Sequence, residues 1–233
     1  MTRVKAWMGG CLPLACFLAG CVNLQPDTPL TAAAGAGRND EVKTLLAQGA
    51  DVNAPGGASI TPLATAARAG NVETIAILLK AGADPNLRSG FAGWAPVMHA
   101  IHKDQERAML ALLEAGADPN RGGANGYTPL MMAAGYGYAQ MARDLLDYGA
   151  DPYAESRDGA TALSFAVGGV PDIDRFTLCA CQPGVVKALL DRAPNLRLPD
   201  NFSGRAALWL ARLGRCPEVV GLVEGRKSAK AGA

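Results

Sequence analysis

One short turn recurs four times, and it restricts the fold more than any other feature of the chain. The pentapeptide GADPN occupies residues 82–86 and 116–120, and the close variants GADVN and GADPY occupy residues 49–53 and 149–153. Successive copies are 33, 34 and 33 residues apart. A fixed period of this length indicates stacked supersecondary units, because a single unit cannot bury its own apolar face.

Each period has the same internal plan of two predicted helices. A Thr-Pro-Leu or related tripeptide marks the first helix, since threonine caps free amides and proline suits the first helical position. These tripeptides start at Thr28, Thr61, Ala95, Thr128, Thr161 and Ala206. A pair of apolar residues marks the second helix, at 45–46, 78–79, 112–113, 145–146, 189–190 and 222–223. In the first four units a glycine follows, where a left-handed residue can end the helix.

The stretch TPLATAARAGNVETIAILLKAGADPN, residues 61–86, resembles the ankyrin repeat. That unit consists of a turn and two antiparallel helices and repeats about every 33 residues. The resemblance extends over residues 28–225. It implies an all-α ankyrin-repeat solenoid of about six helix-turn-helix units with short turn or β-hairpin tips.

The N-terminal segment, residues 1–20, reads as an export signal. Arg3 and Lys5 precede an apolar run that is short for a transmembrane helix. The run ends in LAGC, residues 18–21, which resembles the lipobox of bacterial lipoproteins. The resemblance implies lipidation of Cys21, a linker over residues 21–27, and a lipid anchor at the periplasmic face of the outer membrane, since Val22 replaces the aspartate of the inner-membrane pattern. The alternative is an ordinary secretory signal in which Cys21 is incidental.

The C-terminal units depart from the pattern. The fifth unit carries an insertion at about residues 170–182, and Arg192, Ala193 and Pro194 replace its Gly-Ala-Asp. The sixth unit ends in an apolar segment, and a basic tail over residues 226–233 is expected to be flexible. The sequence leaves open whether the last unit is a cap or a contact surface.

Composition and motifs argue against catalysis and against nucleic acid. Without the signal, 20 basic and 21 acidic residues remain, so no basic excess favours a nucleic acid partner. No nucleophile–base pair, carboxylate pair or phosphate loop is found, which predicts a non-enzymatic protein without a cofactor. His99 and His102 lie three residues apart on one helix face, but two histidines without further ligands are weak evidence for a metal. We expect His99 to pack between repeats and His102 to lie on the surface.

Three cysteines besides Cys21 remain in a compartment that permits disulfides. Aligning the last two units places Cys181 and Cys216 one position apart in adjacent layers. Packed helices lie slightly too far apart for a disulfide, but the insertion can close that gap. We therefore predict that Cys216 pairs with Cys181 or with Cys179. The alternatives are a strained Cys179–Cys181 redox couple and three unpaired thiols.

Ankyrin arrays typically bind proteins with their turn tips and the exposed face of their first helices. Large aromatic and arginine residues at such positions are typical of binding hot spots. They predict a patch centred on the third and fourth units, although each ring could instead pack on its own turn. The predicted partner-binding residues are Phe91, Trp94, His102, Lys103, Tyr127, Tyr136, Tyr148, Arg157 and Arg205.

These observations favour a monomeric, lipid-anchored module that binds an unidentified protein. One specific possibility is an immunity protein that neutralises a toxin or lipase effector. Another is a scaffold that supports a periplasmic protective enzyme such as catalase in oxidative-stress resistance. The alternative from a different class is a redox or metal protein that uses Cys179, Cys181 and Cys216 or the histidines.

Overall fold

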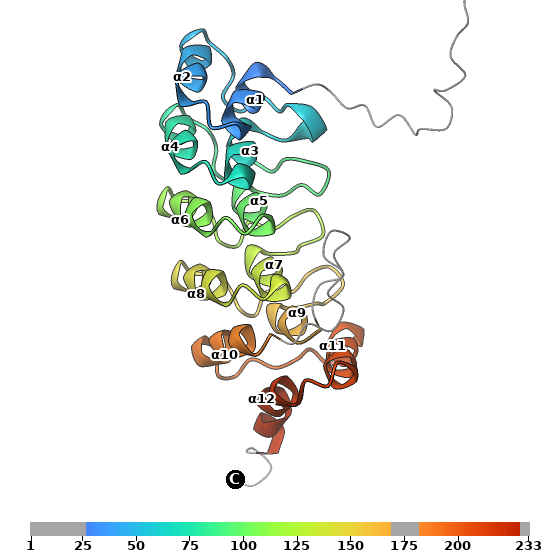
Figure 1. The fold of residues 1–233 in the computed structure, drawn as a ribbon. Helices are drawn as coiled ribbons and strands as arrows, with labels where there is room; N and C mark the ends of the chain where they lie inside the picture. The colour runs from blue at the N-terminus through green and yellow to red at the C-terminus, as the bar shows by residue number, and fades with distance from the viewer. Residues whose placement is uncertain (1–26, 169–181, 229–233) are drawn as a thin grey trace, which may run out of the picture.

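The computed structural model describes residues 27–168 and 182–228, and within these ranges it contains twelve α-helices and no strand. The helices stack in two columns as an elongated solenoid (Figure 1). The expected all-α repeat fold is confirmed. The first helices are α1 Pro29–Gly35, α3 Pro62–Ala69, α5 Pro96–His102, α7 Pro129–Tyr136 and α9 Ala162–Gly168, and the second helices are α2 Asn39–Ala47, α4 Val72–Lys80, α6 Glu106–Glu114, α8 Ala139–Asp147 and α10 Pro183–Arg192.

The predicted capping chemistry starts most of the first helices. The side chains of Thr28, Thr61 and Thr128 accept hydrogen bonds from backbone amides three residues on, at 3.1, 3.3 and 3.2 Å. Each is followed by proline at the first helical position. In the third unit Ala95 has no capping side chain, yet α5 still begins at Pro96.

The core contains small side chains from the first helices and branched side chains from the second helices. Ala66, Ala67, Ala133 and Ala134 are fully buried, which allows consecutive first helices to pack closely. One leucine of each predicted pair in the inner units, Leu78, Leu112 or Leu145, is also fully buried from the second helix. A buried leucine contributes about 1.5–3 kcal/mol by removing apolar surface from water, so each layer stabilises its neighbours.

The repeated pentapeptide forms both a turn and a bridge to the next layer. Its glycines, Gly49, Gly82, Gly116 and Gly149, have φ between 86° and 90°, a left-handed conformation that side chains disfavour. The aspartate then accepts a hydrogen bond from the backbone amide two residues on, at 2.8–2.9 Å in all four copies. This confirms the expected role of the aspartates in binding local backbone.

The asparagine of each turn bonds to the following turn. Asn53 accepts from the amide of Asp84 at 3.0 Å, Asn86 from Asp118 at 2.8 Å, and Asn120 from Asp151 at 2.8 Å. We call these three bonds the asparagine ladder. It ends at the fourth unit, where Tyr153 occupies the asparagine position and Pro194, which has no N–H group, occupies the next aspartate position.

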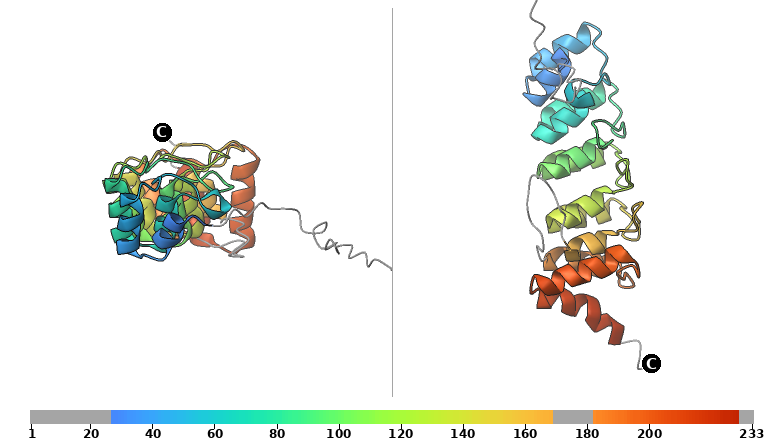
Figure 2. Two further views of the ribbon diagram at one scale, coloured as in Figure 1. Left: turned by 90° about the horizontal axis from the view of Figure 1, so that it is seen from above. Right: turned by 90° about the vertical axis from the view of Figure 1, so that its right-hand side faces the viewer.

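The tips are tight turns, and adjacent tips are bonded. Within the described ranges the only β-bridge joins Ser89 to Trp94. Backbone bonds join successive tips, from Gly90 to Ser59, Ala124 to Ala92 and Arg157 to Asn125, at 2.8–3.1 Å. The tips therefore form a continuous ledge along one side of the solenoid (Figure 2).

The sixth unit corrects two expectations. Its first helix, α11 Phe202–Leu213, begins four residues before the predicted start at Ala206, because the side chain of Asn201 accepts from the Gly204 amide at 3.0 Å and caps the helix earlier. Its second helix, α12 Pro217–Ser228, continues into the segment expected to be a flexible tail from residue 226. α11 stands out from the column of first helices (Figure 1).

Several predicted features lie outside the described residues. These are the signal over residues 1–20, Cys21 and most of its linker, the bulk of the insertion at 170–182 with Cys179 and Cys181, and residues 229–233. In the part of the chain that the structure describes, no helix has the length and apolar character needed to cross a bilayer.

Candidate protein-binding surface

The structure brings three of the predicted binding residues into contact. The ring centroids of Trp94 and His102 lie 5.1 Å apart, and those of His102 and Tyr136 lie 6.0 Å apart. A 2.8 Å hydrogen bond joins His102 Nδ1 and the Tyr136 hydroxyl. Tyr138 extends the series, with its ring centroid 5.6 Å from that of Tyr136. We call Trp94, His102, Tyr136 and Tyr138 the aromatic row.

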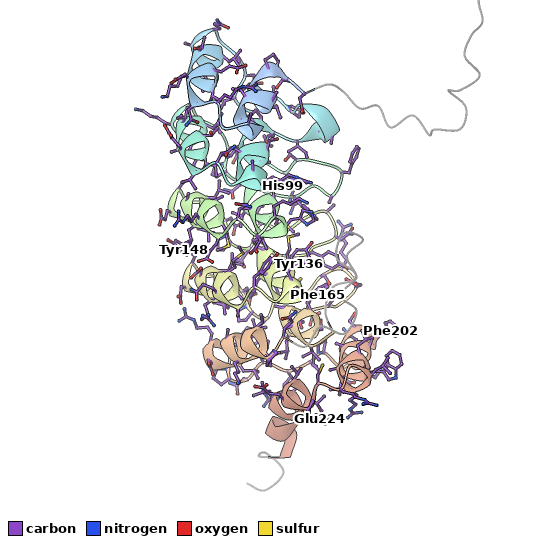
Figure 3. All side chains as sticks on the ribbon, viewed as in Figure 1. His99, Tyr136, Tyr148, Phe165, Phe202 and Glu224 are labelled. Atoms are coloured by element: carbon purple, nitrogen blue, oxygen red, sulfur yellow. The ribbon has the colours of Figure 1, made fainter. Side chains whose placement is uncertain are left out.

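The aromatic row lies on the third and fourth units, on the column of first helices. We call this column the inner layer and the column of second helices the outer layer. His102 ends α5, Tyr136 ends α7, and Trp94 precedes α5 in the tip. All four side chains are half-buried, so their edges contact their neighbours and part of each remains open to solvent. Figure 3 shows Tyr136 in this layer, one repeat beyond His99. Half-buried aromatic rings held by one another form a preorganised surface that loses little entropy on binding.

His99 lies beneath the row and supports it. Its side chain is 3% exposed, and its ring packs edge-on against Trp94 with centroids 5.5 Å apart. Burial lowers the pKa of His99 to about 4, and the Ser89 backbone opposes this shift only in part. The Ser89 backbone lies near the ring, but no hydrogen bond of normal geometry joins either ring nitrogen to a described residue. His99 is therefore a neutral core residue, and its expected position between repeats is confirmed.

Tyr127 forms a second aromatic contact one layer further on. Its ring lies edge-on to Phe165 of α9, with centroids 5.3 Å apart. Its hydroxyl donates to a carboxylate oxygen of Asp158 at 3.3 Å, and burial together with Asp158 raises the pKa of Tyr127. Tyr127 thus joins the tip of the fourth unit to the tip and first helix of the fifth.

The remaining predicted residues are placed separately. Phe91 is 76% exposed at the tip of the third unit, and Arg157 is exposed at the tip of the fifth. Lys103 follows α5 and is half-buried. Tyr148 follows α8 in the outer layer, away from Tyr136 (Figure 3). It lies apart from the aromatic row because the residue before the glycine turn follows the second helix, and its role in binding stays a prediction.

Arg205 also occupies a different position from the one predicted. It was expected in the tip before a helix at Ala206, but it lies inside α11 because that helix starts earlier. Its guanidinium lies 3.6 Å from the carboxylate of Asp200, and both groups are exposed. It is separated from the aromatic row by the fifth unit.

The described residues hold no group of three potential metal ligands. His102 is hydrogen-bonded to Tyr136, and His99 is buried against Trp94. Cys216 is buried and disulfide-bonded. The other half of that bond lies outside the described residues, so its pairing with Cys181 or Cys179 stays a prediction.

Sequence reasoning missed two sets of surface residues. Tyr138 and Phe165 complete the aromatic contacts, but their role depends on distances between adjacent units that spacing does not give. Phe202, Trp209 and Leu213 are the other set, exposed together on α11. Their spacing of seven and four residues is a helical-face signal, which was obscured when the helix was expected to begin at Ala206.

Two columns of short helices, a ledge of bonded tips and a half-buried aromatic face define a repeat scaffold of the protein-binding class. Comparison with family models gives the same class. A model described as "Ankyrin repeats (3 copies)" matches residues 5–89 and 59–123, and one described as "Ankyrin repeats (many copies)" matches residues 112–166.

These matches cover more than half of the chain, so the chain belongs to the ankyrin-repeat family. Ankyrin repeats are generally protein-interaction modules, which agrees with a non-catalytic binding role. Among curated proteins, no match to the chain was found.

Proposed function

We propose that this chain is a lipid-anchored ankyrin-repeat protein that faces the periplasm and binds a protein partner without catalysing a reaction. The aromatic row is the observation that carries the binding site. Four rings from the third and fourth units form one half-buried face, and the 76% exposed ring of Phe91 lies at the tip of the third unit.

Binding a partner costs conformational entropy when side chains must become ordered. Rings that contact one another in the free protein need little reordering when a partner binds, so more of the contact energy appears as affinity. Trp and Tyr are also the side chains most often found at hot spots. The partner predicted by this surface is a folded protein with an apolar or aromatic protrusion that packs against the row.

Covalent capture in the native host tests the site. The protein is compared with a double variant, Phe91→Ala with Tyr136→Phe, which removes the exposed ring and the hydroxyl bonded to His102. Tyr148→Ala is the matched control, because it removes an exposed tyrosine ring from the opposite layer. We expect one captured protein to be reduced by the double variant and retained by the control, as quantified by mass spectrometry.

Equal capture by all three proteins would reject the site, provided that circular dichroism shows the same helicity. The identity of the captured protein separates the specific roles. A delivered toxin or lipase would indicate immunity, whereas a resident catalase would indicate a scaffold.

The anchor is tested independently of the partner. Intact-mass measurement of the protein from its host should show cleavage before Cys21 together with the mass of a diacylglyceryl group and an N-acyl chain. Cys21→Ser should remove both modifications and release the protein from the membrane fraction. An unmodified Cys21 in the mature protein would reject lipid anchoring and leave the binding site unaffected.

A further inference from the structure

The sixth unit exposes an apolar stripe on a different element from the aromatic row. Phe202, Trp209 and Leu213 of α11 are 81%, 61% and 60% exposed. Residues spaced by seven and four lie on one face of an α-helix. Ala207 and Ala211, on the opposite face, are buried against the array. Three large apolar side chains therefore project outward along one helix, and we call them the α11 stripe.

Basic residues accompany the stripe. Residues 197–233 contain seven basic and three acidic side chains, a formal charge of +4, whereas residues 22–196 contain thirteen and eighteen, a formal charge of −5. Arg205 and Arg212 lie on α11 itself, with side chains 69% and 59% exposed, and they pair with the carboxylates of Asp200 and Glu224. Arg197 and Arg205 line a cleft of about 350 Å³ beside the helix. The positive excess of the chain therefore lies in its C-terminal part, and Arg205 and Arg212 place part of it at the border of the stripe.

This combination fits a lipid surface better than a second copy of the chain. Pairing two α11 stripes would bring two positive ends together, which like-charge repulsion opposes. A helix that presents Trp, Phe and Leu with arginines at its border can instead lie in the headgroup region of a bilayer. Tryptophan favours that boundary, and the arginines attract anionic headgroups.

The orientation of α11 is compatible with this contact. Figure 3 shows Phe202 pointing outward on the side of the molecule that carries the tips. The described chain also enters near that side, since Asp27 accepts a hydrogen bond from Gly57 in the tip of the second unit at 2.9 Å. With Cys21 anchored as proposed above, both ends of the solenoid can face one membrane.

We propose that α11 is a membrane-contact helix that inserts Phe202, Trp209 and Leu213 into the headgroup region of an anionic bilayer. The surface would hold the array along the membrane instead of letting it pivot on its N-terminal linker. The interaction does not require lipidation of Cys21, so it can fail or hold separately from the proposed function.

Fluorescence of Trp209 tests the contact directly. A chain that begins at Val22 contains every residue that the structure describes and only two tryptophans, Trp94 and Trp209. Trp94→Phe therefore leaves Trp209 as the single reporter. With vesicles of phosphatidylcholine and phosphatidylglycerol, we expect a blue-shifted emission and quenching by lipids brominated on the acyl chain.

Variants separate insertion from non-specific adsorption. Phe202→Ala with Leu213→Ala should weaken vesicle binding by roughly tenfold or more, because two large apolar groups no longer leave water. Tyr148→Ala is the matched control, since its ring is 41% exposed beside α8, away from the side that carries the tips, and it should bind as the parent does. Arg205→Gln should weaken binding to anionic vesicles and have little effect on binding to vesicles of phosphatidylcholine alone.

Three outcomes would overturn the proposal. The first is a Trp209 emission that vesicles leave unchanged. The second is an equal loss of binding in Tyr148→Ala. The third is sedimentation of the chain as a dimer that the double variant converts to a monomer, because the stripe would then be an interface between copies.

Discussion

The first four units and the last two follow one plan but hold their neighbours by different means. In the first four, the asparagine ladder joins each turn to the next with backbone-directed bonds of 2.8–3.0 Å. Beyond Tyr153 the ladder is absent. The side chains of Asn201 and Ser203 donate to the Gly159 and Asp158 carbonyls at 2.8 and 3.1 Å, and an exposed ion pair joins Lys187 to Glu218 at 2.7 Å.

This difference explains where the molecule can present new surface. The ladder repeats one bond between consecutive turns, whereas the bonds between the last two units follow no repeat, and their exposed ion pair usually contributes less than about 1 kcal/mol. α11 can therefore stand out from the column and expose its stripe without breaking a repeated bond. The inner units carry the aromatic row because the same regularity positions rings from different units against one another.

The comparison predicts that core truncation costs more in the inner units. Leu78→Ala should lower the free energy of unfolding by about 2–5 kcal/mol, because Leu78 is fully buried and a cavity remains. Leu222→Ala, in the half-buried position of α12 that corresponds to the leucine pair, should cost about 1–2 kcal/mol. Urea unfolding followed by circular dichroism measures both values, and equal losses would show that the end unit is packed as tightly as the inner ones.

As the pH falls, the third unit should lose stability before the terminal units do. Burial lowers the pKa of His99 from its ordinary value of 6.5 to about 4 in the folded protein. As the pH falls, the unfolded state therefore binds a proton at His99 before the folded state does. The free energy of unfolding decreases by about 3 kcal/mol between pH 6.5 and pH 4. Above pH 6.5 this contribution is fully present.

Hydrogen exchange of α5 across that pH range measures the effect. His99→Leu should flatten the decline in stability, because leucine fills the buried site and cannot be protonated. His102→Gln is the control, since it changes the neighbouring histidine on the same helix but leaves His99 in place. A decline of the same slope in all three proteins would assign the acid sensitivity to carboxylates elsewhere.

Much of the fold could be predicted from the sequence, because its determinants are local and repeated. The caps at Thr28, Thr61 and Thr128 and the bonds of the turn aspartates lie within a few residues along the chain. The early start of α11 was missed because Asn201 acts as a cap without the repeated Thr-Pro-Leu marker. A helix boundary is set by whichever competing cap satisfies the free amides, and spacing alone does not identify it.

The candidate site could be predicted only in part. Position within the repeat correctly located Trp94 in a tip and His102 and Tyr136 on the first helices, but it did not show that Tyr148 lies apart from them in the other column. Contacts such as Tyr127 with Phe165 depend on the rotation and separation of neighbouring units, which no single repeat contains. The α11 stripe required the true helix start, since a helical face is defined only when its first turn is known.

A pair of glycine substitutions should shift stability in opposite directions. Neither Gly116 nor Gly221 has a neighbouring atom within 4 Å of an added Cβ, so crowding does not decide the result. Gly116 has φ of +86°, and Gly116→Ala should cost about 1–2 kcal/mol through backbone strain. Gly221 lies inside α12, where Gly221→Ala should add about 0.5–1 kcal/mol. Thermal unfolding of the two variants measures the shifts. A shift of the same sign in both would contradict the explanation that backbone conformation decides the effect.

The smallest effect concerns the ladder itself. Asn86→Ala removes the acceptor of the 2.8 Å bond from the Asp118 amide and should cost about 0.5–1 kcal/mol, since the bond is exposed. Tyr153→Asn is the informative counterpart, because it restores the asparagine pattern where the aligned residue of the next turn, Pro194, has no N–H to donate. It should therefore leave stability within about 0.5 kcal/mol of the parent. Chemical unfolding of both variants at one pH shows whether the asparagine stabilises the bond between layers or its own turn. A gain from Tyr153→Asn as large as the loss from Asn86→Ala would mean that the asparagine stabilises its own turn, and the bond between layers would then not be the reason that the pattern repeats.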